Sequence, residues 1–185
     1  MTPSPNDPES TDTERLEEQP APHPRQEEPA KSGERDIAGV VAPPPVIYGG
    51  ALAIGLGLNA FLPSPRIPAE VALPVGIVLL AGGGLLGGSF ISAFRRARTP
   101  IDVGRPTTSL VTTGPYRISR NPGYLGLALA YAGIATLARA PWAFVTLIPA
   151  LLIVDRMVIA REEQYLERRF GEDYRRFKSH TRRWI

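Results

Sequence analysis

The chain has 185 residues, a formal net charge of +3 and no cysteine, which excludes disulfide bonds, thiolate metal sites and cysteine nucleophiles. It has two histidines, so a histidine-rich metal site is excluded as well, and no metal is predicted. The length allows one folded domain with a tail.

Residues 1–45 are predicted to be a disordered, acidic, proline-rich tail. They hold ten acidic and four basic residues, half of the twenty prolines and no aromatic residue. Such a segment cannot bury enough apolar surface to offset the entropy lost on ordering. Residues 46–185, with seventeen basic and eight acidic residues, form the predicted domain. Long uncharged stretches interrupt its basic residues, so we expect no nucleic-acid partner.

Four apolar segments follow, and they predict transmembrane helices at about 46–62, 70–94, 122–138 and 141–170. The first is an uncharged run that spans roughly 26 Å as a helix, against a bilayer core of roughly 30 Å. The short join between the third and fourth segments predicts a tight helical hairpin. The expected fold is an all-α, polytopic membrane bundle of about four transmembrane helices with a cytosolic C-terminal amphipathic helix.

The second segment contains the run GGGLLGG at residues 82–88. So many glycines would weaken a helix in a soluble protein, but in a membrane they let two helix backbones approach closely. The alternative interpretation is a loosely packed helix that faces lipid.

The loop charges predict the orientation of these helices. Arginines are frequent between the second and third segments and after the fourth, whereas the opposite side shows only Arg66 and Arg139. Short cationic loops stay in the cytoplasm, so we expect both termini and the 95–121 loop there. The composition is typical of a bacterial protein, and the expected location is the inner membrane.

Charged residues appear at the end of the fourth segment, in LLIVDRMVIAREE. A charge at membrane depth costs about 3 kcal/mol, so Asp155 and Arg156 either mark the emergence of the helix or serve a function. The run that begins with Glu162 and Glu163 predicts an amphipathic helix, broken at Gly171, that lies on the membrane and contacts lipid headgroups.

The run GPYRISRNPGYLG, residues 114–126, precedes the third segment. Its prolines and glycines predict a bent loop that ends in a helix, with Asn121 at the N-cap and Pro122 in the first turn. Exposed N–H groups at a helix start favour anions, and Arg117 and Arg120 add full positive charges. The run therefore predicts a site for a carboxylate or phosphate; the alternative is a basic turn that anchors the helix.

Together with the C-terminal run REEQYLERRFGEDYRRFKSHTRRWI, this stretch resembles the isoprenylcysteine carboxyl methyltransferase and phospholipid methyltransferase group of integral membrane enzymes. The resemblance covers roughly residues 90–185. The matching positions are Gly114–Arg117, Arg120–Gly126, Glu162, Glu163, Leu166, Phe170, Gly171, Tyr174 and Arg183–Ile185.

The resemblance implies S-adenosyl-L-methionine as the methyl donor, held at the cytosolic ends of the last helices and by the C-terminal segment. The implied cofactor-binding residues are Thr108, Ser109, Leu110, Val111, Tyr116, Asn121, Pro122, Gly123, Tyr124 and Glu162. The chemistry of these residues agrees, because the helix start at Asn121 suits the donor's carboxylate and Glu162 suits its ammonium group.

The acceptor implied is a lipophilic or small molecule, a carboxylate, thiol or lipid amine, that enters from the membrane lipids. Many family members have histidine where this chain has Asn121, which takes up no proton near neutral pH. An ionised acceptor needs no strong base, since alignment and water exclusion supply most of the catalysis. We therefore expect Arg156 to orient an anionic acceptor and Glu163 to take the proton of an amine. The sequence leaves the acceptor and the oligomeric state open.

Two other functions are compatible with parts of the sequence. The sterol reductases share a similar C-terminal arrangement and a related Arg-Asn/His-Pro loop but use NADPH, and they are usually longer. A noncatalytic membrane scaffold that recruits partners through its acidic tail is the third possibility. Stabilisation of the protein by S-adenosylhomocysteine or by NADPH distinguishes the three, because a scaffold would bind neither.

Overall fold

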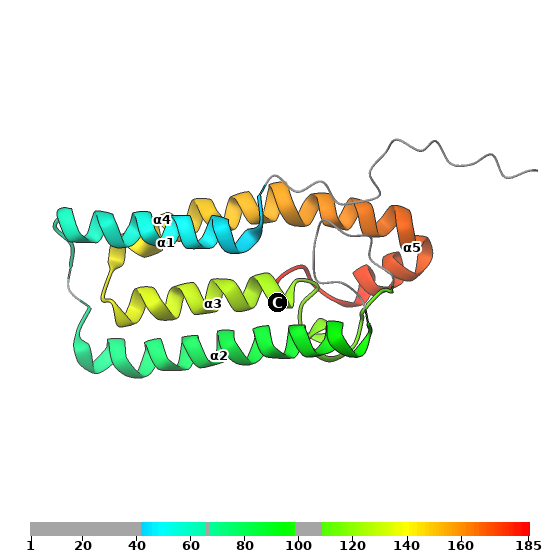
Figure 1. Cartoon of the computed structure of the whole chain (residues 1–185), viewed down its shortest axis with the longest axis horizontal. Coiled ribbons are helices and arrows are strands. Elements are labelled where there is room, and N and C mark those ends of the chain that lie inside the picture. Colours follow the sequence, from blue (N-terminus) through cyan, green and yellow to red (C-terminus); the bar gives the residue numbers. More distant parts are fainter. Residues whose placement is uncertain (1–41, 66, 99–108) are drawn as a thin grey trace, which may run out of the picture. The chain divides into compact units, whose positions relative to one another are not determined.

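The computed structural model describes residues 42–65, 67–98 and 109–185. Nearly all of the predicted tail, and Thr108 of the predicted cofactor site, lie outside these ranges. Every regular element in the described ranges is helical, which confirms the all-α prediction (Figure 1). The elements are α1 (Pro44–Phe61), α2 (Ala69–Arg96), the 3-10 helix η1 (Gly114–Arg117), α3 (Pro122–Leu137), α4 (Pro141–Ile153), the π-helix η2 (Val154–Ile159) and α5 (Ala160–His180).

Prolines begin several of these helices. α1, η1, α3 and α4 each have proline at the first or second helical position, where no N–H partner is lost. Two residues after the end of α3, Arg139 has a left-handed conformation at φ 52°. The backbone N–H groups of Ala140 and Arg139 donate to the carbonyls of Ala135 and Thr136, both at 2.9 Å. This cap turns the chain directly into α4 and forms the predicted helical hairpin.

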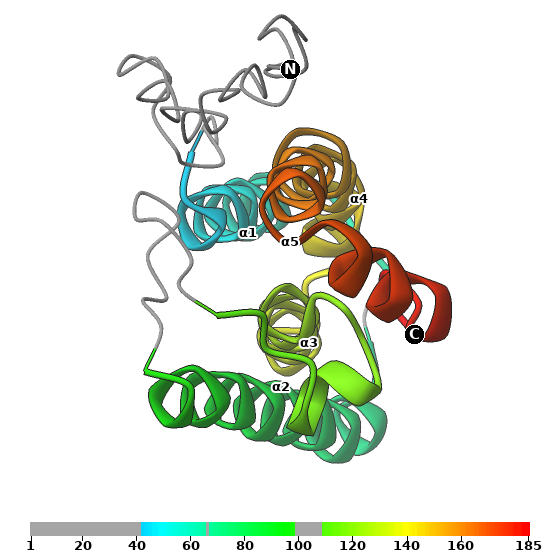
Figure 2. The same ribbon diagram turned by 90° about the vertical axis from the view of Figure 1, so that its right-hand side faces the viewer.

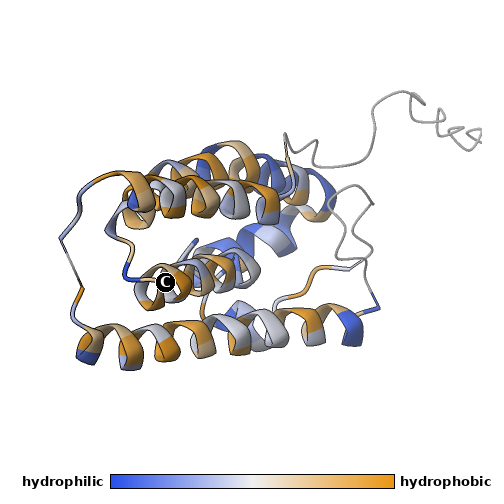
Figure 3. Cartoon of the chain, turned by 60° about the vertical axis from the view of Figure 1, so that its left-hand side comes forward, coloured by the Kyte–Doolittle hydropathy of each residue, from blue (hydrophilic) through white to orange (hydrophobic). Residues whose placement is uncertain are grey.

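Three helices in the described ranges are long and apolar enough to cross a membrane: α1, α2 and the continuous helix Pro141–His180. The protein is therefore an integral membrane protein. α3 is apolar but has only 16 residues, about 24 Å of helix. In the long helix most apolar residues lie in α4 and η2, although η2 also carries Asp155 and Arg156, and α5 is strongly polar from Arg161 onward (Figure 3). We treat α4 and η2 as its spanning part and α5 as lying beyond the membrane.

α2 packs along α3, and α1 packs along α4 (Figure 1). The buried core of the α1–α4 side includes Tyr48, Tyr131, Ala143 and Val154. The hydroxyl of Tyr131 donates to the carbonyl of Ala143 at 2.8 Å. This hydrogen bond ties α3 to α4 within the apolar part of the protein.

Glycines make the contact between α2 and α3 close. A Cβ atom added at Gly83 would lie 2.7 Å from the carbonyl oxygen of Gly126, and one at Gly133 would lie 3.0 Å from that of Gly76. These four glycines form what we call the glycine seam. Other glycines of the 82–88 run, such as Gly82, have nothing within 4 Å of an added Cβ. The close-approach interpretation is therefore confirmed for Gly83, and for glycines such as Gly82 contact with lipid stays a prediction.

α5 is interrupted where the sequence predicts. Gly171 has φ 52° and ψ −122°, outside the helical region, so the helix bends there. The bend directs the second half of α5 and the C-terminal residues back beside α3 and the loop that precedes it (Figure 2). This return of the chain brings the end of the sequence to the candidate site.

Candidate functional site

The candidate site is centred on a hydrogen bond between two helix starts. Tyr124 lies in the first turn of α3 and Glu162 in the first turn of α5. The Tyr124 hydroxyl donates to the Glu162 carboxylate at 2.5 Å. Burial raises the pKa of Glu162 to about 7, the hydrogen bond from Tyr124 opposes this rise, and the charge of Glu163 adds to it. A carboxyl group that titrates near neutral pH in a partly buried position is a candidate binding or catalytic group.

A third element contributes Tyr116. Its ring packs against Phe90 and Phe94 of α2, at centroid distances of 6.4 and 6.2 Å, and against Phe177 of α5 at 6.4 Å. Burial raises the pKa of Tyr116, and the charge of Glu162 adds to the rise, so the phenol lies within electrostatic range of that carboxylate. The structure thus brings together Tyr116, Tyr124 and Glu162 from η1, α3 and α5.

An ion-pair cluster lies beside this site. The buried carboxylate of Glu163 pairs with Arg120 at 3.0 Å and with Arg183 at 2.7 Å. The Arg183 guanidinium also reaches Asp155 of η2 at 3.1 Å. Trp184 donates its indole N–H to Asp155 at 3.0 Å. Asp155 therefore faces a cationic partner from the C-terminus, which explains a carboxylate at the end of the spanning segment.

The C-terminal strip, residues 182–184, is also held through its backbone. The hydroxyl of Ser119 donates to the carbonyl of Arg183 at 3.1 Å. The amide N–H of Arg120 donates to the carbonyl of Arg182 at 2.9 Å. Asn121 occupies the N-cap position of α3, but its side chain makes no capping hydrogen bond and instead donates to the carbonyl of Arg183 at 3.0 Å. Its amide therefore secures the C-terminal strip.

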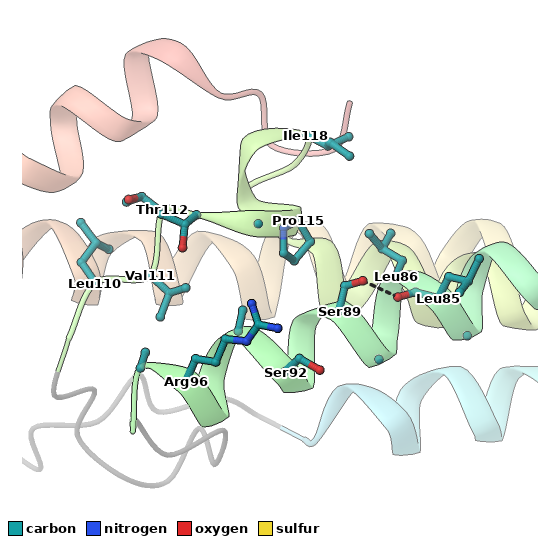
Figure 4. A pocket seen from close by; sticks show the side chains of 16 residues that line it. Leu85, Leu86, Ser89, Ser92, Arg96, Leu110, Val111, Thr112, Pro115 and Ile118 are labelled. Carbon is teal, nitrogen blue, oxygen red and sulfur yellow. Dashed lines mark hydrogen bonds between the residues drawn. The ribbon is translucent and has the colours of Figure 1, made fainter.

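A cavity of about 1050 Å³ lies between the C-terminal end of α2 and the segment 110–118 (Figure 4). Leu110 and Val111 line it opposite Ser92 and Arg96 of α2. Ser109, also predicted to bind cofactor, donates its hydroxyl to the carbonyl of Ala97 at 3.4 Å. The predicted cofactor residues therefore fall into two groups, one on the cavity wall and one around Glu162.

The remaining predicted residues have clear positions. Pro122 is buried, and an added Cβ at Gly123 would lie 3.2 Å from the ring of Phe90, so both pack where α3 begins. Arg156 is exposed on η2, and in the described part of the chain no ion pair or hydrogen bond joins it to Glu163. The two predicted catalytic residues are thus not joined by a polar contact in the described part of the chain.

Sequence reasoning did not find the roles of Asp155 and Arg183. Two signals were present: a carboxylate at the end of an apolar segment, which needs a partner, and the terminal Arg-Trp of the motif. Pairing them requires knowing that the chain bends at Gly171 and returns to η2.

Two comparisons with known proteins found matches to this chain. A 62-residue stretch is 39% identical to an uncharacterized protein from Haemophilus influenzae, covering 34% of this chain and 78% of that protein. No solved structure matches. The model of the family described as phospholipid methyltransferase matches residues 71–173, which include Tyr116, Tyr124 and Glu162. Since this match spans more than half of the sequence, the chain belongs to the phospholipid methyltransferase family.

Proposed function

We propose that the protein is an S-adenosyl-L-methionine-dependent methyltransferase that acts on a lipophilic acceptor at the cytoplasmic face of the membrane. The observation that carries the proposal is the Tyr124–Glu162 hydrogen bond, which holds a partly buried carboxylate between α3 and α5. Membership of a membrane methyltransferase family and the three long apolar helices support it.

The residues around this carboxylate fit the amino-acid part of the donor. Glu162 offers a negative charge to the ammonium group. Arg120 is 10% exposed, and its Nε and Nη1 groups are buried without a hydrogen-bond partner in the described part of the chain. Leaving a buried donor unpaired costs about 1–3 kcal/mol, more for a charged group, so a ligand carboxylate at Arg120 would relieve a cost already present. We therefore assign the donor's carboxylate to Arg120, whereas the sequence alone predicted the helix start at Asn121 for it.

The bound donor would supply a methyl group on a sulfonium, and the chain's residues would position it. Leu110 and Val111 offer an apolar wall to a planar ring. Both oxygens of Glu163 are occupied by Arg120 and Arg183, so its proton-accepting role would require breaking these contacts. A carboxylate or thiolate acceptor, which needs no base, therefore fits this site better than an amine. The exposed Arg156 would meet an anionic group that arrives from the bilayer.

Binding of S-adenosylhomocysteine tests the donor site. In lipid nanodiscs, Glu162→Gln and Tyr124→Phe should each weaken binding, measured by isothermal titration calorimetry, by about tenfold, because each removes part of one charged hydrogen-bonded unit. Tyr131→Phe is the matched control, since its hydroxyl bonds within the α3–α4 core. Wild-type affinity in both site variants would show that the donor does not bind at Glu162.

Product analysis tests the reaction itself. The wild-type protein is incubated with a bacterial membrane extract and methyl-labelled donor, and the lipids and small molecules are examined by mass spectrometry. We expect a labelled lipophilic product that is absent with Glu162→Gln. Stabilisation by NADPH in place of S-adenosylhomocysteine would support a reductase, and stabilisation by neither would support a scaffold.

A further inference from the structure

We infer that Arg183 is a positioning residue: it ties the loop before α3 to Asp155 and Glu163 on the long helix and so keeps Glu162 turned toward Tyr124. The inference rests on the proposed function, because it assigns Glu162 to the donor site. Arg183 lies outside the residues that the family model matches.

The π-helix η2 explains how one guanidinium holds two carboxylates. Asp155 and Glu163 are eight residues apart, which in an unbroken α-helix separates their directions by about 80°. A π-turn takes up roughly one additional residue and reduces this angle to about 20°. Both carboxylates then lie on one side of the helix, where Arg183 reaches Asp155 at 3.1 Å and Glu163 at 2.7 Å.

Arg183 is fixed at its other end by the loop before α3. Its carbonyl accepts hydrogen bonds from Ser119 and Asn121 at 3.1 and 3.0 Å. The residue therefore connects the loop that launches α3 to the helix that carries the acidic pair. Tyr124 and Glu162 belong to the two elements that this connection joins.

Fixing Glu163 also fixes the direction of its neighbour. Consecutive residues of an α-helix point about 100° apart, so when Glu163 is held by Arg183, Glu162 must face another side of α5. That side is where Tyr124 donates its hydrogen bond. If Arg183 is lost, Glu163 keeps its ion pair with Arg120 but loses its second cation, so α5 can shift relative to α3 and the Tyr124–Glu162 contact is held less firmly.

Arg183 acts on the electrostatic environment of Glu162 through Glu163. In the described part of the chain, Tyr124 from α3, Tyr116 from η1 and Glu163 from α5 act on Glu162, and Arg120 and Arg183 both pair with Glu163. The negative charge of Glu163 raises the pKa of Glu162, and Arg183 offsets that charge. Removing Arg183 should therefore raise the pKa of Glu162 further, whereas removing Glu163 together with Arg183 should cancel this effect.

The test measures S-adenosylhomocysteine affinity in nanodiscs from about pH 6 to about pH 8.5, the range around the titration of Glu162. Arg183→Gln should lose about tenfold in affinity at neutral pH and shift the pH midpoint of binding upward by several tenths of a unit. The double variant Arg183→Gln with Glu163→Gln should return the midpoint to the wild-type value or below. Arg176→Gln, an exposed α5 residue with the same loss of charge, should behave as wild type.

The conservative variant Arg183→Lys keeps the positive charge but removes the bridging geometry, so it separates these two effects of Arg183. It also replaces Arg183→Gln in the test if that variant does not fold. One ammonium group cannot bridge both carboxylates, so its affinity should fall about threefold or more while its pH midpoint stays near that of wild type. Unchanged affinity in Arg183→Lys and Arg183→Gln would overturn the inference and leave the proposed function standing. If the wild-type protein itself does not bind S-adenosylhomocysteine, the proposed function fails, and the inference fails with it.

Discussion

Glu162 gives the site a measurable dependence on pH. Its pKa is raised to about 7, mainly by burial, and only the ionised form can pair with an ammonium group. S-adenosylhomocysteine affinity should therefore rise as the pH increases through 7, and binding below this pH should release a proton. Calorimetry in buffers of different ionisation enthalpy measures that release. Glu162→Gln should abolish it, and equal proton release in that variant would show that another group titrates.

For single residues, the sequence predicted which residues belong to the candidate site better than it predicted their contacts. The family motif predicted Tyr124 and Glu162 as cofactor-binding residues, and the structure joins the two by a hydrogen bond. For Asn121 the N-cap position is correct, but the expected cap is replaced by a bond to the carbonyl of Arg183. Local sequence rules describe Asn121 relative to its own helix. They do not predict that the carbonyl of Arg183, 62 residues later, accepts a hydrogen bond from the same side-chain amide.

Among the elements, the glycine seam between α2 and α3 makes a direct prediction. A side chain at Gly83 would meet the backbone of Gly126 and Ala130 at 2.7 Å, so Gly83→Leu should force the helices apart and destabilise the protein by about 1–3 kcal/mol. Gly82→Leu, one residue away with nothing within 4 Å of an added Cβ, is the control.

Thermal unfolding in detergent, followed by size-exclusion chromatography, measures the difference between these two variants. We expect a clear loss of thermal stability for Gly83→Leu and little change for Gly82→Leu. Equal stability of both would contradict close packing of α2 on α3.

Hydropathy was enough to predict the apolar helices, because four apolar runs are separated by proline-rich or charged joins. Of the four predicted transmembrane helices in the described part of the chain, three are long enough to cross a membrane, and α3 is shorter. Hydropathy was not enough to predict η2 or the choice among glycines. A π-turn rotates the residues that follow it about the helix axis by a fraction of a turn, and hydropathy does not register this rotation. Gly82 and Gly83 are the same residue type, so hydropathy cannot distinguish them. Only the partner helix decides which of them is covered.

For the whole molecule, the decisive prediction concerns its two ends. Tyr124, Arg120 and Arg183 make the described polar contacts with Glu162 and Glu163, and Ser119 holds the C-terminal strip that carries Arg183. Deleting residues 1–40 should therefore leave S-adenosylhomocysteine affinity and methyl transfer intact. Deleting residues 182–185 should lower the affinity at least as much as Arg183→Gln, because it removes the guanidinium and the carbonyl groups together.

The two deletions are compared in the same nanodiscs, with calorimetry for binding and labelled donor for turnover. Residues 1–45 carry a net charge of −6, all of it within residues 1–40, and the remaining residues carry +9. Deleting residues 1–40 therefore changes the electrostatics of the chain. Salt above about 0.5 M screens such long-range effects, and the short-range loss from the C-terminal deletion should persist there. A folded protein without residues 1–40 that no longer binds at either salt concentration would place part of the donor site in the N-terminal segment.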